Sequence, residues 1–210
     1  MKVAYLAESP ADAAALKILT EGVLGKATQP ASHVGLEHRG WPTVRTIFPT
    51  VIKQLHYHTD AEGFVLVVDA NGSPPHQATH NPPGPPEPQC RLCQLRGIVE
   101  MARGELRPRA DRPLLRIAVG LAVPTIEAWL LCGADPHVTE AAWINGLKEG
   151  PMPYTKTDLK RRLYGTSRPS LALETEVMTK AANRLAQNLA VIENLFPAGF
   201  GAFASVLRSW

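Results

Sequence analysis

The chain has 210 residues, of which 45% are hydrophobic and 20% charged, and its formal net charge is +3. This composition is typical of a globular domain and excludes a disordered or fibrous chain, while so small a net charge does not by itself indicate a nucleic-acid partner. No apolar run approaches the roughly 20 residues that span a bilayer, and an acidic residue as early as Glu8 does not fit a secretory signal. We therefore expect one cytoplasmic domain over residues 1–210, without a membrane partner.

The first third of the chain alternates strand and helix patterns. The apolar run 63–68 has no polar interruption, which is typical of a central parallel strand covered on both faces. Ser9 followed by Pro10 resembles a helix N-cap with proline in the first turn. His56 and His58 are expected to be surface or helix-end residues. The predicted elements are strands at 2–7, 32–38 and 63–68, and helices at 13–24 and 43–58.

The amino-acid composition changes after the third predicted strand. Seven prolines between residues 73 and 88 predict a loop within a Pro- and Arg-rich insertion at 72–113. A fourth strand is predicted at 114–122, and residues 135–210 are predicted to form a helical extension packed on the core. The predicted helices of this part are 91–104, 126–131, 139–148, 156–164, 171–195 and 200–209. Strand–helix alternation predicts an α/β fold, a parallel sheet of about four strands flanked by helices.

Acidic residues follow the predicted strands. Glu8 follows the first strand, Asp69 and Asn71 follow the third, and Glu127 lies just beyond the fourth. The carboxyl ends of parallel strands meet at one edge of a sheet, so these side chains should converge. Carboxylates that converge repel one another unless a cation lies between them, and Mg²⁺ is commonly held in this way. For Glu8 alone, a structural role is as good an interpretation, and Asp12 is equally explained by the positive end of its helix.

Two of these segments resemble the motifs of Toprim domains. Residues 7–19, with Glu8-Ser9-Pro10-Ala11-Asp12, resemble the first motif, a strand-end Glu followed four residues later by Asp. Val67-Val68-Asp69-Ala70-Asn71-Gly72 resembles the second motif, an Asp-x-Asp after a hydrophobic strand, except that Asn71 replaces the second acid. The resemblance is closest to short bacterial Toprim-like proteins related to the overcoming-lysogenization-defect nucleases. The stretches that carry this closer resemblance are Arg39-Gly40-Trp41, 123–131 and 196–203.

The resemblance implies hydrolysis of a phosphodiester with Mg²⁺ or Mn²⁺. Glu8 would take a proton or bind metal, and the other site residues would be ligands: Asp12, Asp69, Asn71 and Glu127. DNA is the expected substrate, in phage defence or a mobile-element context, and a separate ATPase subunit is a partner that the resemblance implies. The loss of one charge at Asn71 weakens the case for two-metal catalysis and leaves two alternatives, a non-catalytic nucleic-acid-binding or assembly subunit and an RNA-processing nuclease.

Two basic segments are candidates for contacts with phosphate. Residues 91–116 contain seven arginines and three acids, and 156–168 contain five basic residues and one acid, a local excess of +4 in each. Such clusters either follow a phosphate backbone or form a solvated helix face. The candidates for nucleic-acid contact in the second segment are Lys156, Lys160, Arg161 and Arg162.

A second group of residues has the spacing of a metal site. His76, His80, Cys90 and Cys93 supply four zinc ligands, and the Cys-x2-Cys spacing suits two thiolates on one tetrahedral ion. Four protein ligands leave no open position, so the expected role is structural, fixing the Pro-rich insertion. The alternative is a loop in which the histidines and cysteines are incidental.

Overall fold

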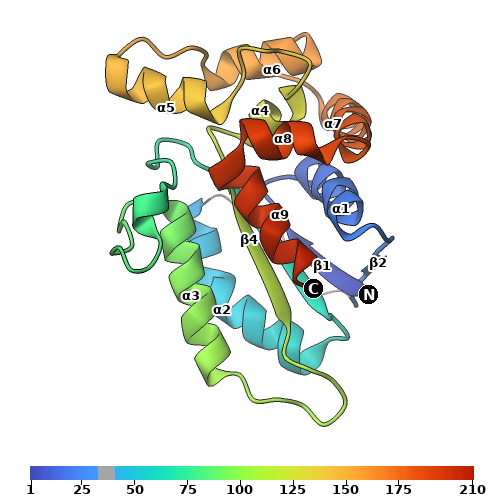
Figure 1. Ribbon diagram of the computed structural model, residues 1–210. Coiled ribbons are helices and arrows are strands. Elements are labelled where there is room, and N and C mark those ends of the chain that lie inside the picture. The colour runs from blue at the N-terminus through green and yellow to red at the C-terminus, as the bar shows by residue number, and fades with distance from the viewer. Residues whose placement is uncertain (33–40) are drawn as a thin grey trace.

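Four strands pair in parallel, in the order β2-β1-β3-β4, in the computed structural model, which describes residues 1–32 and 41–210. The strands are β1 (Lys2–Leu6), β2 (Gln29–Pro30), β3 (Gly63–Asp69) and β4 (Arg116–Ala122). The register pairs Leu66 of β3 with Leu6 of β1 and with Val119 of β4, so that the carboxyl ends of these three strands lie at one edge (Figure 1). The predicted fold class, a four-stranded parallel sheet flanked by helices, is confirmed.

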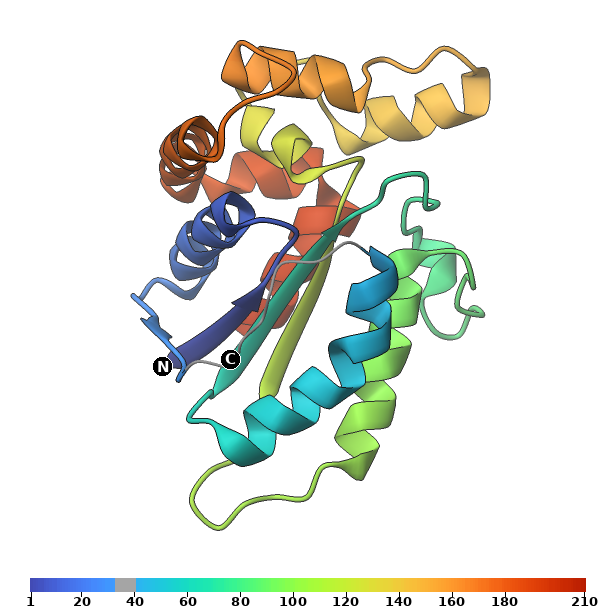
Figure 2. The ribbon, with the colours of Figure 1, turned by 180° about the vertical axis from the view of Figure 1, so that it is seen from behind.

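Helices cover both faces of the sheet, as Figures 1 and 2 show. One layer contains α2 (Trp41–His58) and α3 (Arg91–Glu105), and the other contains α1 (Pro10–Leu24), α7 (Leu171–Ala186) and α9 (Ala202–Arg208). All seven residues of β3 are buried. Val65 and Val67 pack into the layer of α1, whereas Phe64 and Leu66 pack into the layer of α2. This two-sided burial explains the uninterrupted apolar sequence of β3.

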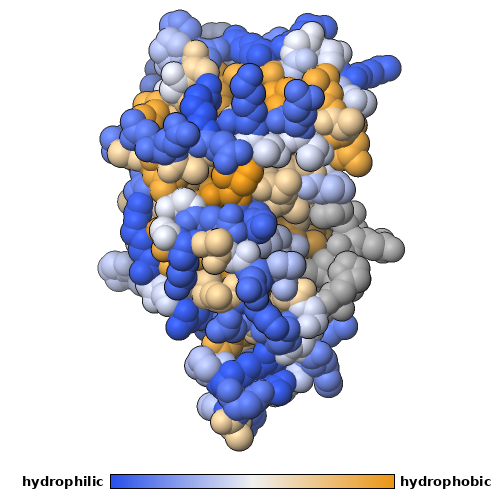
Figure 3. Space-filling model, turned by 90° about the vertical axis from the view of Figure 1, so that its right-hand side faces the viewer, coloured by the Kyte–Doolittle hydropathy of each residue, from blue (hydrophilic) through white to orange (hydrophobic). Residues whose placement is uncertain are grey.

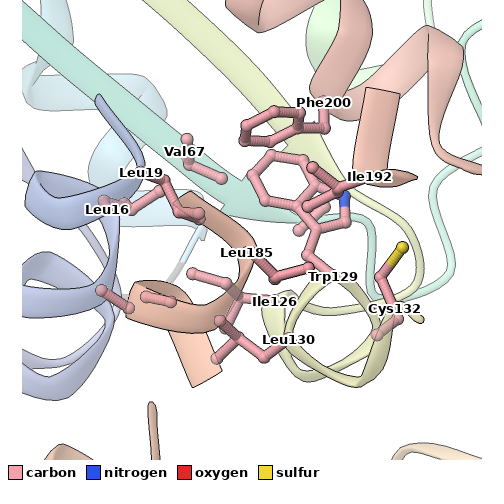
Figure 4. Packing of buried hydrophobic residues seen from close by; sticks show 14 of the residues in the cluster. Leu16, Leu19, Val67, Ile126, Trp129, Leu130, Cys132, Leu185, Ile192 and Phe200 are labelled. Carbon is pink, nitrogen blue, oxygen red and sulfur yellow. The ribbon is translucent and has the colours of Figure 1, made fainter. Parts of the chain in front are cut away.

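Trp129 is at the centre of the larger core. It lies in the short helix α4 (Ile126–Leu131) and is fully buried, with its ring edge-on to that of Phe200 at a centroid distance of 5.3 Å (Figure 4). Ile192 and Leu185 approach the same ring from the C-terminal helices. The C-terminal extension therefore packs on the core of the sheet.

The predicted helix 171–195 is in fact two helices. α7 ends at Ala186, and α8 (Leu189–Leu195) begins after a break at residues 187–188. A straight helix would carry residue 195 about 13 Å beyond Ala186, away from the core. The bend instead brings Ile192 into contact with the residues around Trp129. Similarly, the last predicted helix begins at Ala202, after a wide helical turn at Pro197–Gly201.

The other predicted helices agree closely with α5 (Glu140–Glu149) and α6 (Lys156–Tyr164), which lie beyond the carboxyl edge of the sheet in Figure 1. The predicted strand 32–38 falls almost entirely outside the described residues, and the described second strand is the two-residue β2. The motif Arg39-Gly40-Trp41 likewise lies mostly outside them. The Pro-rich loop contains one short turn of helix, Ala78–His80.

The arginine-rich link after α3 holds the C-terminal end of α2. Arg109 donates to the carbonyl of Tyr57, and Arg112 donates to those of His56 and Ala61. His56 is completely buried, and its Nε2 is 2.8 Å from the carbonyl oxygen of Arg107. His56 is thus a helix-end residue, as one of the two expected positions had it, but it is buried because the link covers this end of the helix. Several arginines of the first basic segment thus satisfy carbonyl groups of the fold.

On the face shown in Figure 3, hydrophobic residues lie in small groups between hydrophilic ones. Of the described helices, none is by itself long and apolar enough to cross a membrane. Residues 189–195 and 197–208 together have the length and composition, but they meet at a bend of 115°.

Candidate functional site

Asp69, at the end of β3, is the anchor of the first site. It is buried, with 8% of the residue exposed. Its Oδ1 accepts a hydrogen bond of 3.0 Å from the backbone N–H of Ile126, the first residue of α4. This bond fixes the carboxylate, because it caps one of the free N–H groups at the start of the helix. The second oxygen, Oδ2, is left to face a neighbouring cleft.

Three more acids gather around Asp69 from different elements. Asp12 comes from the first turn of α1, Glu127 from the first turn of α4, and Glu8 from the segment after β1. Asp12, Asp69 and Glu127 line one cleft of about 80 Å³, and Glu8 acts electrostatically on both aspartates. The structure thus brings together the acids that follow the strands in the sequence.

The acids of this cleft destabilise one another's ionised forms. Burial, and after it repulsion from Glu127, raises the pKa of Asp12 to about 7. Burial, and after it repulsion from Glu8, raises the pKa of Asp69 to about 8, although Lys156 acts in the opposite direction. A bound proton or a bound cation relieves repulsion of this kind. Strongly shifted acids in a cleft are typical of functional sites, although ion-pair networks also produce them.

Lys156, the first residue of α6, extends its side chain into the acidic cleft. Its Nζ is 3.1 Å from Asp69 Oδ2 and 3.3 Å from Asn71 Oδ1. Asn71 lies at the exposed rim with φ of 42°, a left-handed conformation that asparagine adopts more readily than most residues. Asn71 therefore contacts the cleft through the lysine, and its carbonyl oxygen is engaged by an ammonium group.

Glu127 has one carboxylate oxygen that lacks a partner among the described residues. Its residue is 5% exposed, and its Oε1 is 3.7 Å from Nζ of Lys160, which also lies 3.5 Å from Glu174. Its Oε2 is buried without a hydrogen-bond partner among the described residues. Burying an unpartnered carboxylate oxygen is costly, so this atom indicates a place for a ligand. Hard oxygen donors of this kind are the type of ligand that Mg²⁺ prefers in proteins.

The acidic side chains nevertheless do not form a closed cage. Within the ranges 1–32 and 41–210, only the group His76, His80, Cys90 and Cys93 brings three or more potential ligand atoms together closely enough to hold a metal ion. The acids are instead interspersed with two lysines. Any cation at this cleft would therefore compete with the protein's own ammonium groups.

Some side chains of the cleft were missed, and some candidates lie outside it. Glu174 and Tyr164 line the cleft, but they lie in amphipathic helices where no motif distinguishes them. Arg161 and Arg162 are exposed, and the described residues that line the cleft do not include them. Arg162 instead pairs with Asp135 at 2.7 Å. Of the four basic candidates, the structure therefore brings only the two lysines to the acids.

The second site is the His/Cys cluster at the N-terminal end of α3. The ligand atoms of His76, His80, Cys90 and Cys93 all lie within 4.8 Å of one another. His76 Nδ1 is 3.5 Å from the sulfur of Cys93 and 3.7 Å from that of Cys90. Both cysteines are buried, free thiols. This cluster could hold a metal ion, as its spacing in the sequence predicted.

Neighbouring side chains orient the ring of His76. Its Nε2 is 3.0 Å from both Asn81 Oδ1 and Nη1 of Arg96, and Asn81 Oδ1 also accepts a bond of 2.8 Å from Arg96. With Nε2 protonated, this nitrogen donates to Asn81 and Nδ1 offers its lone pair to the thiols, as in a metal-bound imidazole, whereas with Nδ1 protonated Nε2 accepts from Arg96. Burial, followed by the neighbouring thiol of Cys93, raises the pKa of Cys90 to about 11. Without a cation the thiol of Cys90 therefore stays protonated.

Arg91 connects the two sites. It directly follows the ligand Cys90, and its backbone N–H donates to the hydroxyl of Ser73. Its guanidinium donates to the carbonyl oxygen of Asp69 at 2.6 Å and lies 5.0 Å from the centre of the Trp41 ring. Arg91 belongs to the first basic segment, but its sequence position does not reveal this role. One residue thus ties the start of α3 to the end of β3.

Comparison of the chain with models of protein families, with curated proteins and with solved structures finds no match. The chemistry of the two sites is therefore inferred from their own side chains.

Proposed function

We propose that the protein is a Mg²⁺-dependent phosphodiesterase that cleaves nucleic acid, with DNA as the substrate. The observation that carries the proposal is the convergence of Asp12, Asp69 and Glu127 on one cleft, where a buried oxygen of Glu127 has no partner among the described residues. The resemblance of residues 7–19 and 67–72 to Toprim motifs supports the same chemistry and suggests phage defence, with a separate ATPase as partner.

The residues divide the work as follows. Asp12, Asp69 and Glu127, which line the cleft, would supply the oxygen donors for a cation. When bound, Mg²⁺ would neutralise the phosphate and lower the pKa of a coordinated water. Glu8 would take a proton from the attacking water as the water oxygen bonds to phosphorus, and the bond from phosphorus to the sugar oxygen would break. The leaving oxygen would take its proton from solvent, and Lys160 would balance the negative charge that develops.

We also propose that the His/Cys cluster holds a structural Zn²⁺. In a tetrahedral site, bond lengths of about 2.3 Å to sulfur and 2.0–2.1 Å to nitrogen place N and S about 3.6 Å apart. The distances from His76 Nδ1 to Cys93 and Cys90 are 3.5 and 3.7 Å. Two histidines and two cysteines complete the four ligands of such a site. The ion would hold the Pro-rich loop against α3.

A second function is favoured by the contact of Lys156 with Asp69 and Asn71. If Lys156 keeps these two contacts, the cleft binds no cation, and the chain serves as a non-catalytic nucleic-acid-binding or assembly subunit. RNA processing remains the third proposal and differs from the first only in substrate.

The test is an assay of purified protein with plasmid, single-stranded DNA and structured RNA, in Mg²⁺, Mn²⁺ or EDTA. Asp69→Asn and Glu127→Gln preserve side-chain shape and are expected to reduce metal-dependent cleavage at least 100-fold. Glu176→Gln, an exposed residue of α7, is the matched control and should leave it unchanged. Cleavage that persists in both site variants would contradict the proposal. Binding without cleavage would favour the second function, and cleavage of RNA alone the third.

A further inference from the structure

The backbone of Lys156 is fixed, whereas its side chain is free to move. Thr155 and Asp158 form a reciprocal capping box at the start of α6, which holds the first turn of the helix in place. The side chain of Lys156 is 44% exposed, however, and within residues 1–32 and 41–210 its only hydrogen-bond partners are Asp69 and Asn71. Water can solvate the ammonium group once it leaves, whereas the side chain of Asp69 is only 11% exposed, so its carboxylate then needs another cation. The ammonium group can therefore leave Asp69 without disturbing α6.

The ammonium group of Lys156 contacts the oxygen of Asp69 that a bound cation would use. Asp69 Oδ1 is held by the N–H of Ile126, so Oδ2 is the oxygen that a cation would use, and this is the atom that Lys156 contacts. Lysine carries a compact charge on a flexible stem, and an anion must replace Asp69 when the contact is lost. The phosphate of a substrate brought to the same cation is the nearest such anion.

We propose that Lys156 is a displaceable counter-ion, which holds Asp69 in the free protein and moves to the substrate's phosphate when a divalent cation takes Asp69. Cation and phosphate then each strengthen the binding of the other. The ammonium group repels a cation that binds without phosphate, but it attracts the phosphate once that has bound. This inference rests on the proposed phosphodiesterase function. It explains why the acidic cleft contains lysines: their ammonium groups neutralise the acids until the divalent cation and the phosphate both bind.

The inference predicts opposite effects of one substitution. We would titrate Mn²⁺ into the full-length protein, following free Mn²⁺ by electron paramagnetic resonance, with and without a dinucleoside phosphorothioate that offers a phosphodiester-like anion. Lys156→Met is expected to tighten Mn²⁺ binding roughly tenfold in the absence of the anion, since a unit positive charge next to the cation is removed. The same substitution should abolish the increase in Mn²⁺ affinity that the anion produces in the wild type. Lys148→Met, at an exposed position on α5, is the control and should change neither value.

Lys156→Gln provides a second neutral variant, and thermal unfolding checks that both variants are folded. If the wild type binds Mn²⁺ and Lys156→Met binds it equally or less tightly, Lys156 is a fixed structural partner and the inference is overturned, while the proposed function stands. If the wild type and both variants bind no Mn²⁺ with or without the anion, the proposed function itself is overturned. If only the variants bind Mn²⁺ without the anion, the inference is supported in its strongest form.

Discussion

The acidic cleft and the His/Cys cluster gather metal-binding side chains in different ways. The cluster takes its ligands from one short stretch, residues 76–93, and its ligand atoms already lie within 4.8 Å of one another. The cleft takes its acids from residues 8 to 127 and counters their charge with Lys156 and Lys160. A closed set of ligands suits an ion that is held permanently, whereas acids balanced by lysines suit an ion that arrives with substrate. The contrast teaches that the closeness of candidate ligands and the balancing of their charge are separate properties of a site.

The largest expected effect is loss of the metal at the cluster. A metal at about a thousandfold its dissociation constant stabilises a fold by about 4 kcal/mol, which for a chain of this size is roughly 10 °C in Tm. A strong chelator should lower the Tm of the wild type by that amount, as measured by calorimetry. Cys93→Ser should lose this response to chelator.

Cys132→Ser is the control, because Cys132 is a buried thiol outside the cluster. It should be less stable than the wild type but should respond to the chelator as the wild type does. A purified protein with less than a tenth of an equivalent of zinc would contradict the structural role.

The next effect concerns pH and comes mainly from the cleft, with a further contribution from Glu140, whose pKa burial raises to about 7. The pKa of Asp12 is raised to about 7 and that of Asp69 to about 8, so the folded protein keeps protons that the unfolded chain has lost above about pH 4. This contribution to stability is present at low pH and is lost as pH rises through the folded-state pKa values. Between pH 6 and 8, without Mg²⁺, the free energy of unfolding should fall by up to about 1.4 kcal/mol per pH unit for each proton retained. Urea unfolding measures it.

Glu127→Gln removes a charge that repels both aspartates and should flatten this pH dependence. A Mg²⁺ concentration that saturates the cleft should flatten it as well. If stability instead rises from pH 6 to 8, the acids do not repel one another as their positions imply.

Arg91 tests whether the two regions are connected. Arg91→Met removes the hydrogen bond from the guanidinium to the carbonyl of Asp69, at an expected cost of about 1.5–3 kcal/mol in unfolding free energy. Arg103→Met, at an exposed position on the same helix, should change it by no more than about 0.5 kcal/mol. A double-mutant cycle of Arg91→Met with Cys93→Ser should give a coupling of at least about 0.5 kcal/mol. Strict additivity would mean that the cluster and the cleft are independent.

The smallest effect is expected outside the cleft. Arg162 and Asp135 form a partly exposed ion pair, which contributes at most about 1 kcal/mol. Arg162→Ala should therefore change stability little and leave Mn²⁺ binding unchanged, in contrast to Lys156→Met. A large loss of Mn²⁺ affinity would extend the site to Arg162.

The sequence by itself determined the central strand and both candidate sites. An uninterrupted apolar run such as 63–68 has one stable position in an α/β sheet, and acids placed after parallel strands meet because the strand ends do. The His/Cys spacing is short enough for local chain geometry to bring its ligands together. These features depend on periodicity and on short distances along the chain, which can be read without a structure.

Only the tertiary structure decided which charges meet. Lys156 contacts Asp69 across 87 positions of sequence, Arg91 joins the start of α3 to the end of β3, and His56 is buried under an arginine-rich link. The break at residues 187–188 likewise follows from the need of Ile192 to reach the core around Trp129. Long, flexible side chains take their partners from the packing of helices, and packing is a property of the whole chain rather than of any segment. For this reason two lysines that a sequence offers to phosphate are found, in the folded protein, holding the acids of the cleft.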